Sequence, residues 1–171
     1  MLSNTMTFSA IVNNNYLQIS HHFGQLHINH VTIDMPFDIC SLTVSNDKIY
    51  VVYSKIRHDG FYLIDSDIPL NNIVAYDFFG KCVWKIEDVW GKSAVVKEQM
   101  KLGLPFCRVE WHTSESYIKY VPYKSSYNKI SASNKHFEVT SGHEYLVCHT
   151  IMGERYTLDL TVDEIVHIAN E

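Results

Sequence analysis

Histidine is the residue type in this chain that most suggests chemistry, because the sequence holds ten of them and a histidine changes charge near neutral pH. The densest group is His21, His22, His27 and His30. In an extended strand the side chains of residues 27 and 30 point to opposite faces, so they cannot hold one ion without a bulge. No HExxH and no 2-His-1-carboxylate spacing occurs. We expect surface or hairpin histidines, with a hydrolase or metal enzyme as an alternative.

Sequence motifs for nucleophilic catalysis and for nucleotide binding do not occur. There is no GxSxG elbow, no cysteine-protease signature, no P-loop and no GxGxxG. The acidic pairs Asp65/Asp67 and Asp163/Glu164 fall at expected turns and caps, where local hydrogen bonds explain them. We therefore expect a protein that is not an enzyme, with no catalytic residue, no cofactor and no bound metal.

Charge is distributed unevenly along the chain. The segment from Ser116 to Phe137 holds four lysines and no acidic residue, so its net charge is +4. The whole chain has a net charge of −5, so the residues outside the segment carry −5 − 4 = −9. Interleaved tyrosine and lysine can stack on bases and neutralise phosphates, so one alternative is a single-stranded nucleic-acid-binding protein using residues 117–135. Its candidate residues are Tyr117, Lys119, Tyr120, Tyr123 and Lys124. A pI near 6.0 argues against a broad basic face, and a plain solvated hairpin would also explain the segment.

The acidic remainder favours a basic protein as partner. Carboxylates on a surface accelerate association with a positively charged protein, and tyrosine is a frequent anchor at protein interfaces. We therefore expect a protein-binding module. The expected partner-binding residues are Asp65, Asp67, Glu87, Asp88, Glu110, Glu115, Tyr117, Tyr120 and Tyr123.

Period-two alternation of apolar residues dominates the chain and predicts strands. Turn-forming residues such as Asn46-Asp47 and Asp59-Gly60 separate them. The expected strands are Thr7–Val12, Tyr16–Ser20, Gln25–Ile33, Ile39–Val44, Lys48–Ser54, Phe61–Asp65, Asn72–Asp77, Cys82–Glu87, Phe106–His112, Tyr117–Val121, His136–Thr140, Glu144–His149 and Arg155–Asp159.

Two short helices interrupt this pattern. One is expected over residues 93–102 with Ser93 as its cap, and the other over residues 162–169 behind a capping box of Thr161 and Glu164. A strand through Ile165–Ile168 is the alternative for the second segment. Together the patterns predict one mainly β domain over residues 1–171, in which antiparallel hairpins form a sandwich, an open barrel or propeller-like sheets.

The four cysteines bear on the cellular compartment. Cys40, Cys82, Cys107 and Cys148 lie far apart, and each is in phase with apolar neighbours of an expected strand. A free cysteine behaves as a small buried hydrophobe, so we expect reduced thiols and a cytoplasmic protein, with disulfides between neighbouring strands as the alternative. The start lacks the features of a signal peptide, and no run of about 18 apolar residues occurs, so we expect a soluble chain without a membrane span.

One segment resembles a hairpin of a known architecture. Asn72–Ile86 reads NIVAYDFFGKCVWKI, and its AYDxxGKxxW pattern looks like the hairpin of a blade in quinoprotein-type β-propellers. Glu144–Asp159 is a looser echo of it. The resemblance implies a strand, a tight turn ending in glycine and a second strand with an inward aromatic, and it carries over no cofactor. A closed propeller needs at least four blades of roughly 40 residues, and four are not found.

The general character of the chain is similar to that of immunity proteins, which neutralise bacterial toxins and are often compact, acidic and β-rich. This resemblance implies a bacterial protein that covers the active site of a basic toxin such as a nuclease. A nuclease must be basic to hold its substrate, and an acidic inhibitor is attracted to that surface.

Overall fold

The computed structural model describes residues 6–12, 14–54, 72–90, 106–120, 138–151 and 153–170. These residues form twelve strands and two short helices, and a mainly β, antiparallel fold is thereby confirmed. The strands are β1 (Met6–Val12), β2 (Asn15–His22), β3 (Gln25–Ile28), β4 (Val31–Asp34), β5 (Asp38–Val44), β6 (Lys48–Ser54), β7 (Ile73–Asp77), β8 (Cys82–Lys85), β9 (Phe106–Thr113), β10 (Glu144–Thr150), β11 (Glu154–Asp159) and β12 (Glu164–Asn170). The helices are α1 (Ile86–Trp90) and α3 (Ser114–Tyr120), and neither is long and apolar enough to cross a membrane.

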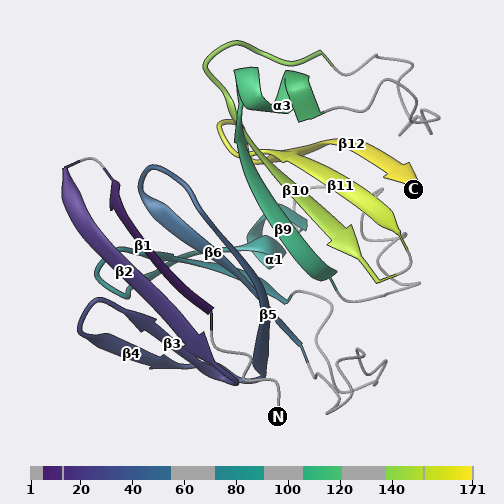
Figure 1. Cartoon of the computed structure of the whole chain (residues 1–171). Coiled ribbons are helices and arrows are strands. Elements are labelled where there is room, and N and C mark those ends of the chain that lie inside the picture. Colours follow the sequence, from purple (N-terminus) through teal and green to yellow (C-terminus); the bar gives the residue numbers. More distant parts are fainter. Residues whose placement is uncertain are drawn as a thin grey trace.

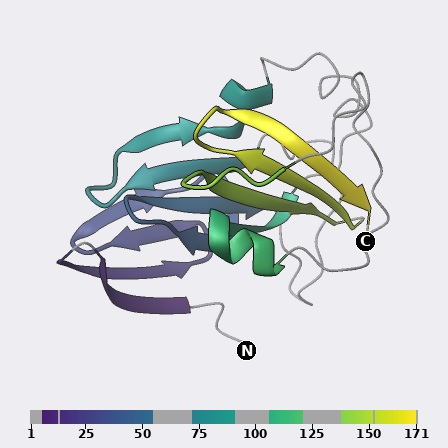
Figure 2. The same cartoon turned by 90° about the horizontal axis from the view of Figure 1, so that it is seen from above.

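The strands form three sheets, each made of four strands that follow one another in the chain (Figure 1). Sheet 1 contains β1–β4, sheet 2 contains β5–β8 and sheet 3 contains β9–β12. Neighbouring strands are antiparallel throughout each sheet. Seen from above, the sheets lie in layers, with sheet 2 between the other two (Figure 2). None of the sheets formed by the described residues closes into a barrel.

Strand β6 explains why sheet 2 is the central layer. Ile49, Val51 and Tyr53 point from one face of this strand into a core shared with sheet 1. Tyr50 and Val52 point from the other face into a core shared with sheet 3. A strand that is buried on both faces needs a continuous apolar run, and the sequence IYVVY supplies one.

Sheets 2 and 3 meet along their first strands, β5 and β9. The amide of Val109 donates to the hydroxyl of Ser41 at 3.2 Å, and the amide of Trp111 donates to the hydroxyl of Thr43 at 3.3 Å. The partners advance in the same direction along both strands, so β5 and β9 run parallel. Side-chain hydroxyls thus accept from the edge amides of β9 where no neighbouring strand does so.

A fully buried amide, Asn72, ties the start of β7 to both β6 and β9. Its side-chain nitrogen donates to the carbonyls of Tyr53 at 2.9 Å and Phe106 at 2.8 Å. Its side-chain oxygen accepts from the amide of Phe106 at 3.0 Å. One side chain therefore satisfies three buried backbone groups from two sheets.

We predict that Asn72→Ala lowers the free energy of unfolding by about 3 kcal/mol, because it leaves buried backbone donors and acceptors without partners. Urea denaturation measures the change. The exposed amide Gln18 provides the matched control, since Gln18→Ala removes a side chain of similar chemistry from the surface. Equal midpoints for the two variants would contradict the role given to Asn72.

Sheets 1 and 2 also meet at a glycine in the turn between β7 and β8. Gly80 has a φ of 84°, and a Cβ built on it would lie 2.7 Å from Cγ1 of Val31 in β4. Valine is stiff about χ1, so it cannot move aside freely. Gly142 has a similar φ of 79°, but nothing lies within 4 Å of its Cβ position.

We expect Gly142→Ala to cost about 1 kcal/mol of stability through its left-handed backbone alone. Gly80→Ala should cost about 2–3 kcal/mol, since a steric clash with Val31 is added. The double variant Gly80→Ala/Val31→Ala should be more stable than the sum of the single changes predicts. Equal losses for the two glycine variants would show that the contact between the sheets does not matter.

Two expectations about strands were wrong, because a turn divides one of them and a helix shortens the other. Gln25–Ile33 is not one strand but β3 and β4, joined by a turn in which Asn29 has a φ of 51°. The strand expected over Cys82–Glu87 ends at Lys85, where α1 begins. An asparagine accepts a left-handed backbone at low cost, which favours a tight turn over an extended chain.

In two further segments the expected type of element was wrong: one expected strand is a helix, and one expected helix is a strand. Tyr117–Val121 is not a strand, because its described part lies in α3, whose first turn is capped by the Thr113 hydroxyl accepting from the Ser116 amide at 3.2 Å. The helix over 162–169 is wrong, and the alternative strand is correct as β12. Pairing with β11 buries Ile168 and Ala169 on opposite faces, which a single helix on the surface would not do.

Other expectations concern residues outside those described. These are the strand Phe61–Asp65 and the helix over 93–102. Of His136–Thr140 the structure describes residues 138–140, which are not in a strand. The propeller-like hairpin Asn72–Ile86 forms β7 and β8, with Gly80 in the turn and Trp84 pointing inward, as the pattern implied.

Candidate protein interface

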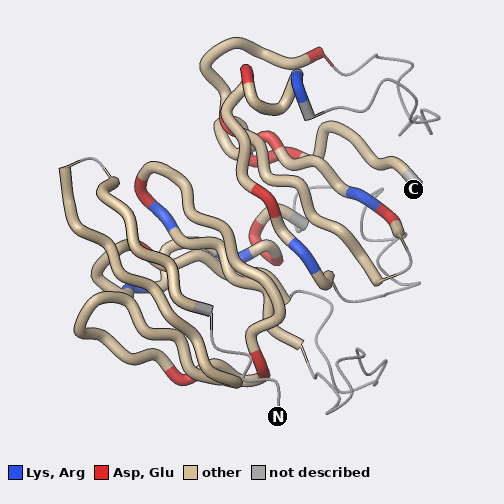
Figure 3. The backbone as a smooth tube through the Cα atoms, in the orientation of Figure 1, with Lys and Arg blue, Asp and Glu red and all other residues tan. Residues whose placement is uncertain are grey.

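Carboxylates gather at one end of sheets 2 and 3. The described residues include fourteen acidic and six basic side chains. Figure 3 shows red segments where the strands of sheet 3 turn beneath α3, whereas sheet 1 is almost entirely tan. We call the cluster at the turns of sheets 2 and 3 the acidic end, and it consists of Asp47, Glu144, Asp159, Asp163 and Glu164.

Two hairpin turns position these carboxylates. In the turn between β5 and β6, the Ser45 hydroxyl accepts from the amides of Asp47 and Lys48 at 3.3 and 2.9 Å. In the turn between β11 and β12, Asp159 accepts from the amide of Thr161 at 3.0 Å, and Asp163 has a φ of 61°. Both turns are held by local hydrogen bonds, so the carboxylates occupy defined places.

Three of these carboxylates lie near the hydroxyl of Tyr50 and affect its pKa. Burial is the main cause that raises the pKa of Tyr50, and the negative charges of Asp47, Glu144 and Asp163 raise it further. Asp47 belongs to sheet 2 and the other two belong to sheet 3. These three carboxylates, from two sheets, therefore lie close enough to act on the same hydroxyl.

Trp84 links the two sheets beside these carboxylates. Its indole nitrogen donates to Oδ1 of Asp163 at 3.4 Å, and its ring meets Tyr50 edge-on with centroids 5.6 Å apart. Trp84 is half-buried, and its neighbour Val83 is exposed. Tryptophan is frequent among the residues that dominate binding at protein interfaces.

The carboxylates at the acidic end differ in how far they are neutralised. Asp159 is paired with His143 at 2.7 Å, and Asp47 is paired with Lys48. The half-buried Glu144 and the exposed Glu164 make no ion pair within the described residues. These two side chains are the groups that can meet positive charge on a partner.

Of the expected acidic residues that the structure describes, Glu115 lies at the same end of sheet 3 as Glu144. It is exposed in the first turn of α3, which begins where Thr113 of β9 faces Glu144 of β10. Glu87 and Asp88 are exposed on α1, and because β8 runs away from the Asp47 turn, they lie at the opposite end of sheet 2.

The other described residues expected at the interface lie neither at the acidic end nor on α1. Glu110 is half-buried in β9, where it accepts from Arg108 and lies 3.2 Å from Nε2 of His149. Tyr117 is only 2% exposed, with its hydroxyl 2.9 Å from that of Thr157. Asp65, Asp67 and Tyr123 lie outside the described residues. Tyr120 is the last residue of α3.

Tyr117, the first stacking residue expected for nucleic-acid binding, is not available to a base in this structure. The ring of Tyr117 is stacked on that of Tyr145 at 5.0 Å, in the small core beneath α3. A base cannot stack on a ring that the protein already covers. Lys119 is exposed on α3, and Lys124 lies outside the described residues.

The four N-terminal histidines do not converge on one point. His21 is buried on the inward face of β2, while His22 and His27 are on the outward face and His30 is in a turn. His27 lies 3.0 Å from the Thr32 hydroxyl. Among the residues that the structure describes, no group of three or more histidine, cysteine or acidic side chains is arranged to hold a metal ion.

All four cysteines are free, but they are not equally buried. Cys148 is buried, Cys40 and Cys107 are half-buried, and Cys82 is exposed, contrary to expectation. Cys82 begins the edge strand β8, and the register of this strand shifts between Ala75 and Tyr76. The alternation that places Trp84 inward therefore does not extend to Cys82.

Burial lowers the pKa of three histidines below the ordinary value of 6.5: His21, His112 and His167. The unfolded chain therefore binds more protons than the folded chain as the pH falls below about 6.5, so acid destabilises the fold. We predict that the free energy of unfolding is smaller at about pH 5.5 than at about pH 7.5. His21→Leu should reduce this difference, and an unchanged difference would contradict the assignment.

The sequence matches no family model, and no curated protein is similar to it. From the sequence, Asp163 and Glu164 are expected in a helix cap, and neither Glu144 nor Trp84 is among the expected interface residues. The signal that could have found them is that turns of successive hairpins bring their carboxylates to the same end of a stack of sheets.

Proposed function

We propose that this chain is a protein-binding module whose acidic end binds a basic protein, in the manner of an immunity protein that covers the active site of a toxin nuclease. The observation that carries the proposal is that carboxylates from two sheets gather near Tyr50, while the half-buried Trp84 donates to one of them, Asp163. The excess of acidic over basic side chains in the described residues supports it.

The physical basis has two parts. The negative field of the acidic end attracts a basic surface from a distance and increases the association rate. At contact, Trp84 supplies apolar area, while Glu144 and Glu164 form a charged rim around it. The carboxylates are held by turns on packed sheets, so little conformational freedom is lost on binding.

The test uses basic nuclease domains, taken first from any such genes that neighbour this one in its source genome. We expect one of them to be less toxic to cells when it is expressed with this chain. The double variant Glu144→Lys/Glu164→Lys should reduce the association rate at low salt by about tenfold or more. Thermal melting of the variant checks that the fold is intact.

The matched control is Glu87→Lys/Asp88→Lys, which makes the same charge change at the other end of sheet 2. It should affect association much less. If the control slows association as much as the first variant does, the acidic end is not the binding site. If no neighbouring nuclease domain is bound or neutralised, the proposed function is wrong.

A further inference from the structure

Sheet 1 differs from the rest of the protein in its lack of charge. Between residues 1 and 37 the only lysine, arginine, aspartate or glutamate is Asp34. Figure 3 shows this sheet as almost entirely tan, in contrast to the red and blue segments of sheets 2 and 3. Two copies of an acidic protein repel one another through their net negative charge, and this repulsion is weakest where uncharged surfaces face one another.

The backbone of β1 is open along one side. Among the strands that the structure describes, β1 is an end strand of sheet 1 and pairs with β2 alone. The amide of Gln18 in β2 donates to the side chain of Asn29, and its carbonyl accepts from the amide of Asn29, both at 2.8 Å. The backbone of Gln18 thus faces away from β1, so Ser9, which lies opposite Gln18, must direct its own amide and carbonyl to the open edge.

The same alternation assigns the other residues of β1. Thr7 and Ile11 lie two residues from Ser9, so their backbone groups also point to the open edge. Phe8 and Ala10 instead face β2. The edge therefore presents three backbone donors and three acceptors in a regular row.

The usual protections of an edge strand do not occur in β1. Its seven residues, MTFSAIV, include no charged residue, no proline and no glycine. The other outer strands are protected. β4 and β8 have four residues each and end in Asp34 and Lys85, while β12 begins with Glu164. The inner strands β5 and β9 face one another.

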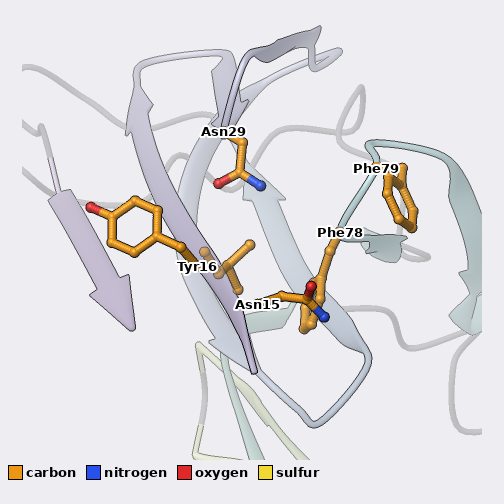
Figure 4. A pocket seen from close by; sticks show the side chains of 6 residues that line it. Asn15, Tyr16, Asn29, Phe78 and Phe79 are labelled. Carbon is orange, nitrogen blue, oxygen red and sulfur yellow. The ribbon is translucent and has the colours of Figure 1, made fainter. Parts of the chain in front are cut away.

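Exposed apolar side chains lie beside this edge. Ile11 and Tyr16 are cross-strand neighbours and are 76% and 64% exposed. Tyr16 also lines a cavity of about 190 Å³ between turns of sheets 1 and 2, together with Leu17, Asn15, Asn29, Phe78 and Phe79 (Figure 4). A neutral strand with exposed apolar neighbours favours pairing with another strand over contact with water.

We propose that two copies of this chain associate by antiparallel pairing of their β1 strands, centred on Ser9. In this register Ser9 faces Ser9 of the second copy, and Thr7 faces Ile11 of the second copy. All three residues direct their backbone groups to the edge, so the register uses each donor and acceptor. The pairing joins the two copies of sheet 1 into one eight-stranded sheet about a two-fold axis, which closes the assembly at a dimer.

A second copy fits this edge better than another partner does. The strand is complementary to itself about its central residue, and it has no charge to attract a basic or an acidic protein. Covering Ile11 and the exposed side of Phe8 adds apolar burial to the backbone hydrogen bonds. The acidic end is formed by turns of sheets 2 and 3, so the dimer leaves it accessible.

The test is the mass of the protein in solution, measured by sedimentation equilibrium on the full chain. We expect a dimer for the wild type and a monomer for Ser9→Pro, with a dissociation constant raised at least about tenfold. Proline removes only the amide that points to the open edge, so each copy should still fold. Circular dichroism confirms folding, and Ser9→Ala is the control that should remain dimeric.

A crosslink tests the register. In a Cys82→Ser background, which removes the exposed thiol, Ser9→Cys should form a disulfide-linked dimer under mild oxidation, because the two residues face one another. Gln18→Cys, on the same face but one strand away from the edge, should crosslink much less. A monomeric wild type at about 100 µM, or a folded Ser9→Pro variant that dimerises as the wild type does, overturns the proposal.

Discussion

The side-chain amide of Asn72 is the interaction on which the arrangement of sheets 2 and 3 depends. It bonds to backbone groups of β6 and β9 at the point where β7 begins, inside the apolar core. Its bonds fix the first residue of β9 against sheet 2, and from there the hydroxyls of Ser41 and Thr43 keep β9 beside β5. This alignment brings the turns of the two sheets to the same level, and the acidic end exists because they are at that level.

The stacking of the sheets divides the surface into regions with different chemistry. The central strands of sheet 2, β6 and β7, are covered on both faces, whereas its turns and the edge strand β8 reach the surface. Those turns and the turns of sheet 3 carry the carboxylates, whereas sheet 1 presents a neutral edge and apolar side chains. Binding of a basic protein and pairing of two copies would therefore use separate surfaces.

The strands were largely predictable from sequence, because alternation along strands such as Lys48–Ser54 is strong. Local patterns failed where partners distant in sequence decide the outcome. Residues 162–169 have helical spacing and a capping box, yet pairing with β11 makes them a strand. The acidic character of the surface was predictable from composition, but its place was not, since Glu144 and Trp84 come together only through the stacking of sheets. The burial of Tyr117 was likewise not predictable from local sequence, because it depends on contacts with the distant residues Tyr145 and Thr157.

The order of the strands has a consequence for biosynthesis. Each sheet is complete once its own consecutive residues have emerged from the ribosome, so few contacts have to wait for distant parts of the chain. Sheet 2 is the exception, since Tyr50, Val52 and Ile73 acquire their cover only when sheet 3 has been synthesised. A nascent or prematurely terminated chain that stops before β9 would carry this apolar face uncovered, as a substrate for chaperones.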